Sequence, residues 1–394
     1  MRHSFIVTTY NIDSYITRCL DSLRPCTRPG DEIIVVDDGS TDGTAERVEA
    51  LLAAGGFGPE VTLRPILLGA NTIGGVGIPG NIGMSAAEGE AVFFVDGDDW
   101  LEPDGFLACR RAFESSGADI LLGNYMEYDE QAGQSRPPAD ARRWSGLAAA
   151  QDATARQRFA LALIAVPWRK FYRRSFLQEH RLKFPEGNFF FEDNPFHWEV
   201  CQKAGSIAFL DRILCQHRIN RPGQTMASTG QELGAFFTHY ETIRSRLPAG
   251  DAGLQGAALD WLINNMAWHV TRLHPEARWP YANRAAEVLA SCPADLWAGA
   301  RQRFLTTSIG GMAEALRRGE IAAVVSAWNS DHLRRQISDL GNRISTLQAS
   351  VTTLQDDGKT QAARLDGLRQ IAEFSALKAL ARGFAPDDQT ETPA

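Results

Sequence analysis

Short apolar segments alternate with amphipathic segments through the first hundred residues. The apolar segments are rich in β-branched and aromatic residues, which is typical of buried strands; they cover residues 5–9, 32–36, 61–68 and 91–95. Between them, apolar residues recur every three or four positions, which predicts helices over residues 12–23 and 44–52. This alternation of strand and helix predicts a parallel sheet with right-handed crossovers.

The pattern continues less regularly to about residue 226. It predicts a short helix near residues 84–88, further helices over 101–113, 148–164, 175–180 and 195–204, and strands over 119–125 and 207–210. Beyond residue 230 the chain reads as helical to about residue 325. We therefore expect an α/β domain over residues 1–226 and a helical domain over residues 227–328.

A third pattern begins near residue 329. Apolar residues alternate spacings of four and three, are interrupted at Gly358 and Gln361, and then resume in register; they are Leu333, Ile337, Leu340, Ile344, Leu347, Val351, Leu354, Leu365, Leu368 and Ala372. This heptad repeat predicts a coiled coil over residues 329–376, followed by a disordered acidic tail over 377–394. β-branched residues at one seam position and Leu at the other favour a parallel homodimer. The alternative is a single helix that folds back on the rest of the chain.

Two of the predicted strands end in clusters of carboxylates. Asp37 and Asp38 follow the second strand, and Asp96, Asp98 and Asp99 follow the strand over residues 91–95. Clustered carboxylates repel one another and desolvate poorly, so a divalent cation would stabilise them. The carboxyl ends of parallel strands share one edge of the sheet, where ligands bind in open α/β folds. The alternative is a pair of solvated turns that cap the following helices.

Composition narrows the classes of function. The chain has 394 residues, a net charge of −8 and no block of basic residues, which argues against a dedicated nucleic-acid binder. Its six cysteines form no CxxC pair, so we expect reduced, buried thiols. The N-terminus has no signal-like segment, and no apolar run approaches the about 20 residues that span a bilayer. We therefore expect a cytoplasmic protein, with contact at the inner face of the membrane left open.

A glycine-rich segment offers a competing interpretation. Gly75-x-Gly77-x-x-Gly80 matches a dinucleotide fingerprint, with Asp96 at a suitable distance. The first glycine of such a fingerprint should follow its strand directly, but here residues 69–74 intervene. An NAD(P)-binding oxidoreductase is therefore a disfavoured alternative.

A further pair of carboxylates follows an apolar run. Phe189, Phe190 and Phe191 precede Glu192 and Asp193. Asp193 could cap a helix that begins at Pro195, because Asp and then Pro form a common helix start. A role in a site is compatible with that capping.

Several motifs, in this order, resemble those of family 2 of the nucleotide-sugar glycosyltransferases, which have the GT-A fold. They are Thr8-Thr9-Tyr10-Asn11, Asp37-Asp38-Gly39-Ser40-Thr41-Asp42, Asn81-Ile82-Gly83, Asp96-Gly97-Asp98-Asp99, Trp168-Arg169-Lys170 and Phe191-Glu192-Asp193. The resemblance covers about residues 4–226. It implies a Rossmann-like, mostly parallel sheet flanked by helices.

The resemblance also implies roles for individual residues. Tyr10 would lie against the nucleobase, and Asp38 would accept a hydrogen bond from it, most naturally from N3–H of uracil. Asp96 would reach the ribose or a metal-bound water. Asp98, with Asp99, would hold Mn²⁺ or Mg²⁺ at the diphosphate. The remaining expected contacts to the nucleotide sugar come from Thr8, Asn81, Lys170 and Arg218.

Asp193 would be the general base that takes the proton of an acceptor hydroxyl. Such assistance is typically worth ~10²–10⁴-fold in rate. Attack opposite the leaving diphosphate would invert the anomeric centre, and the departing charge would be stabilised by the cation.

The chain departs from the family pattern at Gly80, where many relatives carry an arginine. A cation near the diphosphate is then missing, and the candidates to replace it are Arg169, Lys170, Arg218 and Arg221. Trp168 is expected to belong to the core rather than to bind sugar, and His217 to be a hydrogen-bonded loop residue rather than a third metal ligand. The Gln-x-x-Arg-Trp signature of processive synthases is absent, which favours transfer of one sugar per encounter.

We therefore expect an inverting glycosyltransferase that moves a single sugar from a nucleoside-diphosphate sugar, with UDP favoured, to a hydroxyl. The acceptor would be a glycan or glycolipid in the synthesis of surface polysaccharide or lipopolysaccharide. The expected protein partner is a second copy of the chain, bound through the coiled coil. A non-catalytic GT-A-like scaffold of a glycan-assembly complex is the main alternative.

Overall fold

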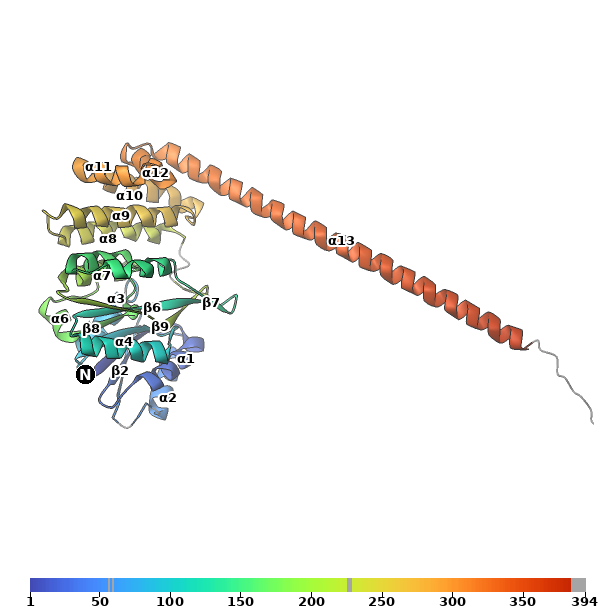
Figure 1. Ribbon diagram of the computed structural model, residues 1–394, viewed down its shortest axis with the longest axis horizontal. Helices are drawn as coiled ribbons and strands as arrows, with labels where there is room; N and C mark the ends of the chain where they lie inside the picture. The colour runs from blue at the N-terminus through green and yellow to red at the C-terminus, as the bar shows by residue number, and fades with distance from the viewer. Residues whose placement is uncertain (56, 59, 225–228, 384–394) are drawn as a thin grey trace, which may run out of the picture. The chain divides into compact units, whose positions relative to one another are not determined.

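The computed structural model describes residues 1–383 apart from 56, 59 and 225–228, with side chains described to residue 378 (Figure 1). One sheet runs in the order β3-β2-β1-β4-β8-β6-β9-β5, and β7 pairs with β6. The strands are β1 (His3–Thr9), β2 (Glu32–Asp37), β3 (Thr62–Leu67), β4 (Ala91–Asp96), β5 (Trp100–Leu101), β6 (Ile120–Asp129), β7 (Gln134–Arg136), β8 (Lys170–Arg173) and β9 (Ile207–Ile219).

Helices flank this sheet, and the described chain after β9 contains only helices and the segments that connect them. They are α1 (Asp13–Leu23), α2 (Thr44–Ala54), α3 (Gly77–Ala86), α4 (Pro103–Ser116), α5 (Ala153–Ala162), α6 (Arg174–Glu179), α7 (Asp193–Lys203), α8 (Ala235–Arg246), α9 (Ala252–Val270), α10 (Arg278–Ala290), α11 (Ala294–Phe304), α12 (Ser308–Arg317) and α13 (Ile321–Gly383). Short 3₁₀ turns are η1 (Arg24–Cys26), η2 (Ala141–Ala149), η3 (Pro167–Arg169), η5 (Gln231–Gly234) and η6 (Pro275–Ala277).

The parallel half of the sheet brings the acidic turns together. β1 pairs with β2 and with β4 in parallel, and Thr9 lies opposite Asp37 while Thr8 lies opposite Asp96. Both carboxylate clusters therefore follow strands that end at the same edge, as the sequence predicted. A ligand at this edge can contact both clusters.

Most paired positions of the sheet are parallel, as predicted, and antiparallel pairs join it beyond β4. β8 runs antiparallel to both β4 and β6, and β5 runs antiparallel to β9. β9 returns parallel to β6 and extends over thirteen residues, well past the strand expected over residues 207–210.

Apolar side chains of alternating strand positions pack on both faces of the sheet. On one face, Phe5, Phe93 and Phe171 are fully buried against α1 and against Phe106 of α4, with the rings of Phe93 and Phe171 4.7 Å apart. The opposite face is covered by α3, α6 and α7 (Figure 1). This three-layer arrangement fixes the ends of the central strands.

Helix α3 begins at Gly77, seven residues before the helix expected there, so the glycine-rich segment is partly helical. A Cβ on Gly83 would lie only 2.3 Å from Cγ2 of Ile6. Glycine therefore permits the helix to approach β1 more closely than any other residue would. The helical propensity of this stretch is poor, and packing on the sheet outweighs it.

Contacts divide the chain into one compact unit, Met1–Val325, and a second that begins at Ser326. The first unit includes helices α8 to α12, so the predicted helical region packs together with the α/β sheet. The predicted boundary at residues 226 and 227 lies outside the described residues. Within the described part of the chain, no helix is both long enough and apolar enough to cross a bilayer.

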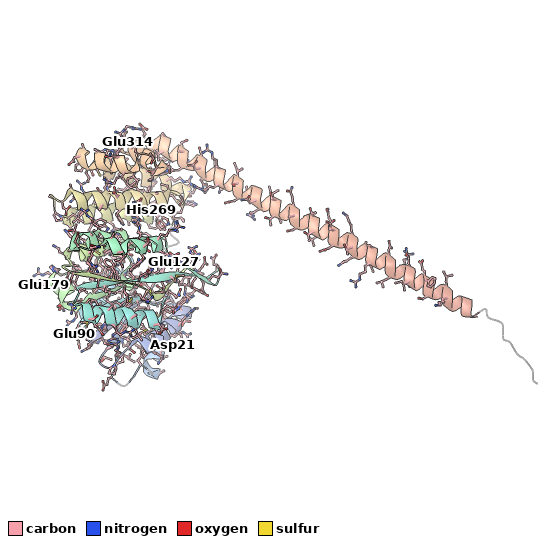
Figure 2. The ribbon with its side chains drawn as sticks, viewed as in Figure 1. Asp21, Glu90, Glu127, Glu179, His269 and Glu314 are labelled. Atoms are coloured by element: carbon pink, nitrogen blue, oxygen red, sulfur yellow. The ribbon has the colours of Figure 1, made fainter. Side chains whose placement is uncertain are left out.

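Helix α13 carries the predicted heptad stripe. Taken by itself, its side chains project on every side (Figure 2), and the large apolar residues of the stripe are all more than half exposed. The helix is as predicted, whereas its pairing into a coiled coil stays a prediction. The first residues of the predicted disordered tail, 377–383, continue α13 instead, and residues 384–394 lie outside the described residues.

Candidate active site

A cavity of about 400 Å³ lies at the carboxyl ends of β1, β2 and β4. Chain segments far apart in the sequence meet there, including the end of β1, the glycine-rich loop before α3, the start of α7 and the loop after β9. Six of the predicted site residues line it: Thr8, Tyr10, Asp38, Asp96, Asp98 and Asp193.

The end of β1 is held by the turn that follows β2. Asn11 has a left-handed backbone with φ of 49°, its side-chain oxygen accepts from the backbone N–H of Thr41 at 2.8 Å, and its own N–H donates to Oγ of Ser40 at 2.9 Å. This interlock leaves the ring of Tyr10 46% exposed at the cavity. An exposed aromatic face beside a cavity is suited to stacking on a planar ligand.

The two carboxylates after β2 have different surroundings. Asp37 accepts hydrogen bonds from the hydroxyls of Thr9 and Ser40 at 2.9 and 2.6 Å, and so holds the turn. Asp38 lines the cavity and accepts from the backbone N–H and the hydroxyl of Thr72 at 3.0 and 2.9 Å. The glycine-rich loop is thereby tied to the predicted base-binding residue, a contact that the sequence did not predict.

The acidic turn after β4 meets cationic side chains from the end of β9. The carboxylate of Asp98 forms an ion pair with the Arg221 guanidinium, which also lines the cavity. Asp99 contacts Nδ1 of His217 at 2.9 Å and accepts from the backbone N–H of Arg218 at 2.7 Å. Asp98 and Asp99 thus have different partners.

Asp96, Asp99 and His217 form a candidate metal centre. Each offers one ligand atom, and these atoms lie within 4.8 Å of one another. Carboxylate oxygens suit Mg²⁺ and Mn²⁺. Of the two predicted metal ligands, Asp98 and Asp99, only Asp99 belongs to this group, because Asp98 pairs with Arg221. Asp96 is the second carboxylate of the group.

The charged groups of this centre shift one another's pKa values. Burial, followed by the charges of Asp99 and Asp98, raises the pKa of Asp96 well above its usual value. Burial also raises the pKa of Asp99, although His217 opposes that shift. Burial alone would lower the pKa of His217, but Asp99 and the other carboxylates outweigh it and raise that pKa to about 9. The site therefore favours an added positive charge, whether a proton or a metal ion.

Two carboxylates at the start of α7 close the other side of the cavity. Desolvation raises the pKa of Asp193 to about 6, against the opposing effects of the Lys170 charge and of a 2.9 Å hydrogen bond from Nδ2 of Asn194. Phe191, two residues earlier, has a left-handed backbone with φ of 66°, which is strained for a bulky residue. A carboxyl group that titrates near neutrality is suited to proton transfer.

Glu192 joins this segment to the glycine-rich loop. Its Oε1 accepts from the backbone N–H of Gly77 at 2.6 Å, at the start of α3. A Cβ on Gly75 or Gly77 would lie 2.7 or 2.8 Å from atoms of the Glu192 side chain, so the fit requires glycine at both positions. Burial raises the pKa of Glu192 to about 7.

Three of the predicted nucleotide-sugar contacts do not line the cavity. Asn81 exchanges two hydrogen bonds of 2.9 Å with the backbone of Phe184. Lys170 is fully buried and donates to the carbonyl of Val166. Arg218 donates to the carbonyl of Asp98 at 2.9 Å and pairs with Glu130. Of the four cations considered for the missing charge at Gly80, only Arg221 lines the cavity.

Trp168 and His217, each of which had two possible roles from the sequence, lie against one another. Trp168 is 3% exposed and stacks on the His217 ring with centroids 4.8 Å apart, so it belongs to the core as expected. His217 is hydrogen-bonded, as expected, but it lies in strand β9 rather than in a loop, and it also belongs to the candidate metal centre. Asp99 and His217 are 118 positions apart in the sequence, which explains why the sequence pattern alone did not group them.

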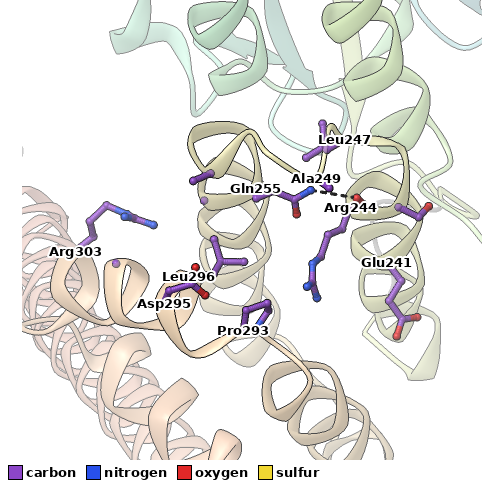
Figure 3. A pocket seen from close by; sticks show the side chains of 13 residues that line it. Glu241, Arg244, Leu247, Ala249, Gln255, Pro293, Asp295, Leu296 and Arg303 are labelled. Atoms are coloured by element: carbon purple, nitrogen blue, oxygen red, sulfur yellow. Dashed lines mark hydrogen bonds between the residues drawn. The ribbon is translucent and has the colours of Figure 1, made fainter.

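A larger cavity of about 830 Å³ lies between α8, α9 and α11 (Figure 3). Two of its charged residues are engaged in ion pairs, Glu241 with Arg284 and Arg303 with Asp260. None of the predicted site residues lines it. The chemistry suited to catalysis is therefore at the sheet edge.

The sequence and the fold are similar to those of known glycosyltransferases. Residues 4–181 match the family model described as Glycosyl transferase family 2. These matched residues, less than half of the chain, are similar to a family 2 glycosyltransferase domain. EpsH of Bacillus subtilis (strain 168) is 30% identical to it over 226 residues, or 55% of this chain and 60% of EpsH.

A second relative links this family 2 domain to a solved structure. The poly(ribitol-phosphate) beta-N-acetylglucosaminyltransferase TarS of Staphylococcus aureus (strain Mu50) is 30% identical over 230 residues, or 58% of this chain and 37% of TarS. The crystal structure of TarS residues 1–349 with UDP-GlcNAc superposes with a TM-score of 0.65 at 22% identity, covering 84% of this chain and 92% of that one. The predicted GT-A fold is confirmed. The matches span no more than about 60% of the length of EpsH or TarS.

We predict that Glu192→Gln changes how stability depends on pH. The pKa of Glu192 in the folded protein is about 7, above its usual 4.5, so its contribution to stability is full below pH 4.5 and is lost as pH rises through 7. Glutamine does not titrate and can still accept from Gly77. Denaturant unfolding at pH 5 and 8 should therefore show a stability gain of the variant over wild type at pH 8, approaching about 3 kcal/mol.

The matched control is Glu49→Gln, which removes the same charge from an exposed position on α2. It should follow the wild-type pH dependence. An identical pH dependence of wild type and Glu192→Gln would contradict the assignment of a proton-binding role to Glu192.

Proposed function

We propose that the chain is an inverting glycosyltransferase that transfers one sugar from a nucleoside-diphosphate sugar, with UDP favoured, to a hydroxyl group. The observation that carries this proposal is the single cavity that joins Asp38, the acidic turn after β4 and Asp193. Support also comes from TarS, which is named for N-acetylglucosamine transfer and whose structure contains UDP-GlcNAc.

The donor occupies the side of the cavity formed by β1, β2 and β4. Tyr10 stacks on the base, Asp38 accepts its N–H, and Thr8 and Asp96 face the ribose and diphosphate. Asp38 already receives two hydrogen bonds from Thr72 and one from Nδ2 of Asn71 at 3.3 Å. A carboxylate has about four lone-pair positions, so it retains capacity for one hydrogen bond from the base. The loop contact then holds that carboxylate in one orientation.

The cation is Mn²⁺ or Mg²⁺, held by Asp99 with Asp96, Asp98 and His217 as the available partners. When bound, it acts as a Lewis acid for the departing diphosphate. Asp98 pairs with Nε of Arg221 through Oδ2, which leaves Oδ1 to join this set. Arg221 lines the same cavity, so its guanidinium would contact the diphosphate and replace the charge that relatives carry at the position of Gly80.

Asp193 is the general base. Its pKa of about 6 leaves it mostly ionised at neutral pH while keeping it basic enough to accept a proton. It lines the cavity together with the acidic turn, in line with a hydroxyl that attacks the donor sugar from the side away from the diphosphate. Such an attack inverts the anomeric centre.

The competing interpretations account for fewer observations. Gly77 and Gly80, which suggested a dinucleotide fingerprint, are accounted for by packing, since their Cβ positions lie 2.8 Å from Cγ of Glu192 and 3.0 Å from Cε2 of Phe184. A scaffold without activity would have no need for Asp38, Asp98 and Asp193 around one cavity. Synthesis of a surface glycan, a cytoplasmic location and contact with the inner face of the membrane stay predictions.

The first experiment is thermal unfolding with UDP, GDP, TDP or NADH, each with and without Mn²⁺ or Mg²⁺. We expect one nucleoside diphosphate, UDP, to stabilise the wild type only with metal, by ~2.7 kcal/mol at about 100 times its dissociation constant. Asp99→Asn should abolish this effect, whereas Asp104→Asn, an exposed residue on α4, should retain it. Stabilisation by NADH alone would indicate the oxidoreductase, and stabilisation by none of the four would favour the scaffold.

Asp193→Asn should separate binding from transfer. The variant should keep the stabilisation by UDP and metal but release UDP from a UDP-sugar at least 100-fold more slowly, since a positioned base contributes ~10²–10⁴-fold. In the wild type, kcat/KM should fall as pH decreases through about 6, because the base is then protonated. Turnover of Asp193→Asn at the wild-type rate would rule out this base.

The stripe on α13 should pair two copies of the chain. It has Ile337, Ile344 and Val351 at one seam position and leucines at the other, a pattern that favours two parallel helices. Light scattering should give twice the mass of one chain for the wild type and a single chain for Leu340→Glu/Leu347→Glu. Ser338→Glu/Ser345→Glu adds the same charge outside the stripe and should remain dimeric, while a monomeric wild type would refute the pairing.

A further inference from the structure

A separate groove of about 460 Å³ lies where α5, α7, α9 and the segment before β8 meet. It begins next to the proposed base, since Asn194 lines it and its side-chain amide donates to Oδ1 of Asp193 at 2.9 Å. The groove is therefore one residue away from the point where an acceptor hydroxyl would be deprotonated. Its lining does not include the residues proposed to bind the donor.

The lining has the chemistry of a carbohydrate-binding surface. Trp261 contributes a partly exposed aromatic ring, one face of which stacks on Phe236 with centroids 5.6 Å apart, while Trp198 is buried at its edge with centroids 6.5 Å apart. Asn264 and Asn265 add side-chain amides from α9. Amides can donate and accept at once, which suits adjacent hydroxyl groups, and aromatic faces suit the apolar faces of sugar rings.

The acidic residues of this groove are already neutralised. Asp140 is 3% exposed and accepts from the Arg169 guanidinium and from the backbone N–H of Ile164 at 2.6 and 2.8 Å. Asp260 is paired with Arg303 at 2.6 Å. Neither carboxylate is left to balance an additional cation.

Two exposed arginines of the groove, by contrast, have no such partner. Arg143 from η2 and Arg158 from α5 line it, and neither forms an ion pair with any carboxylate of the described residues. The guanidinium of Arg158 lies over the start of α9, 3.0 Å from the Cβ position of Gly253. On a chain with a net charge of −8, this groove presents two available positive charges beside the base.

We propose that this groove is the acceptor subsite and that it selects a polyhydroxylated chain carrying an anionic group, a phosphate or a carboxylate. This inference rests on the proposed transferase function. The terminal hydroxyl reaches Asp193, while the preceding units extend along α7 and α9 with their anionic groups near Arg143 and Arg158. Guanidinium groups bind phosphate and carboxylate through paired hydrogen bonds, and the partly exposed position keeps the interaction reversible and salt-dependent.

The test is titration calorimetry of the full chain, with UDP and Mn²⁺ present, against three soluble oligomers of similar length. They are a ribitol-phosphate oligomer, an oligogalacturonate and a neutral malto-oligosaccharide. We expect at least one anionic oligomer to bind tenfold or more tightly than the neutral one, and to weaken as salt is raised. Which anionic oligomer binds distinguishes phosphate from carboxylate.

Arg143→Gln/Arg158→Gln should weaken binding of that oligomer at least tenfold. Arg111→Gln/Arg142→Gln makes the same change in charge at exposed positions outside the groove and should bind as wild type does. Equal affinity for charged and neutral oligomers, no binding of either anionic oligomer, or unchanged binding by the groove variant would overturn the proposal.

Thermal stabilisation by UDP and metal, measured on the same proteins, separates this inference from the function on which it rests. If UDP stabilises all variants but no anionic oligomer binds, only the anionic acceptor subsite is wrong. If UDP fails to stabilise the wild type, the transferase function itself is wrong.

Discussion

Mutual repulsion among carboxylates at one edge of the sheet is the constraint on which this site depends. Asp96, Asp98 and Asp99 lie within four positions at the end of β4, where burial raises the pKa of Asp96 and of Asp99. His217 and Arg221, from the end of β9 and the loop after it, form ion pairs with Asp99 and Asp98. Long-range pairing of β9 beside β6 and β5 therefore positions the cations that the acidic turn needs, and the same imbalance makes the centre receptive to a metal ion.

Close backbone approach is the second requirement. The loop before α3 contacts Asp38 through Thr72 and Glu192 through Gly77, so one segment connects the proposed donor and acceptor sides of the cavity. Its glycines are needed because the carboxylate of Glu192 occupies the space of any side chain at Gly75 or Gly77. The cost is a buried carboxyl group with a raised pKa, which is compatible with a site that must hold two substrates in register.

The helical region supports the segment that carries Asp193. Nε2 of His239 on α8 lies 2.6 Å from the carbonyl of Phe190, and Phe236 packs on Phe191 with ring centroids 4.9 Å apart. The strained backbone of Phe191 is thus held from outside the α/β sheet. The same region supplies α9 to the groove next to Asp193, so these helices belong to the active unit rather than forming an unrelated addition.

The sequence by itself determined the alternation of strands and helices, the two acidic turns at one sheet edge, the family motifs and the heptad stripe. These follow from local periodicity and from the geometry of parallel strands. Only the tertiary structure decided that Asp37 holds a turn while Asp38 faces the cavity, that Arg221 rather than Arg218 or Lys170 reaches it, and that Asn81 binds the backbone of Phe184. Those outcomes depend on contacts between segments about 30 to 120 residues apart, and local periodicity carries no information about such contacts.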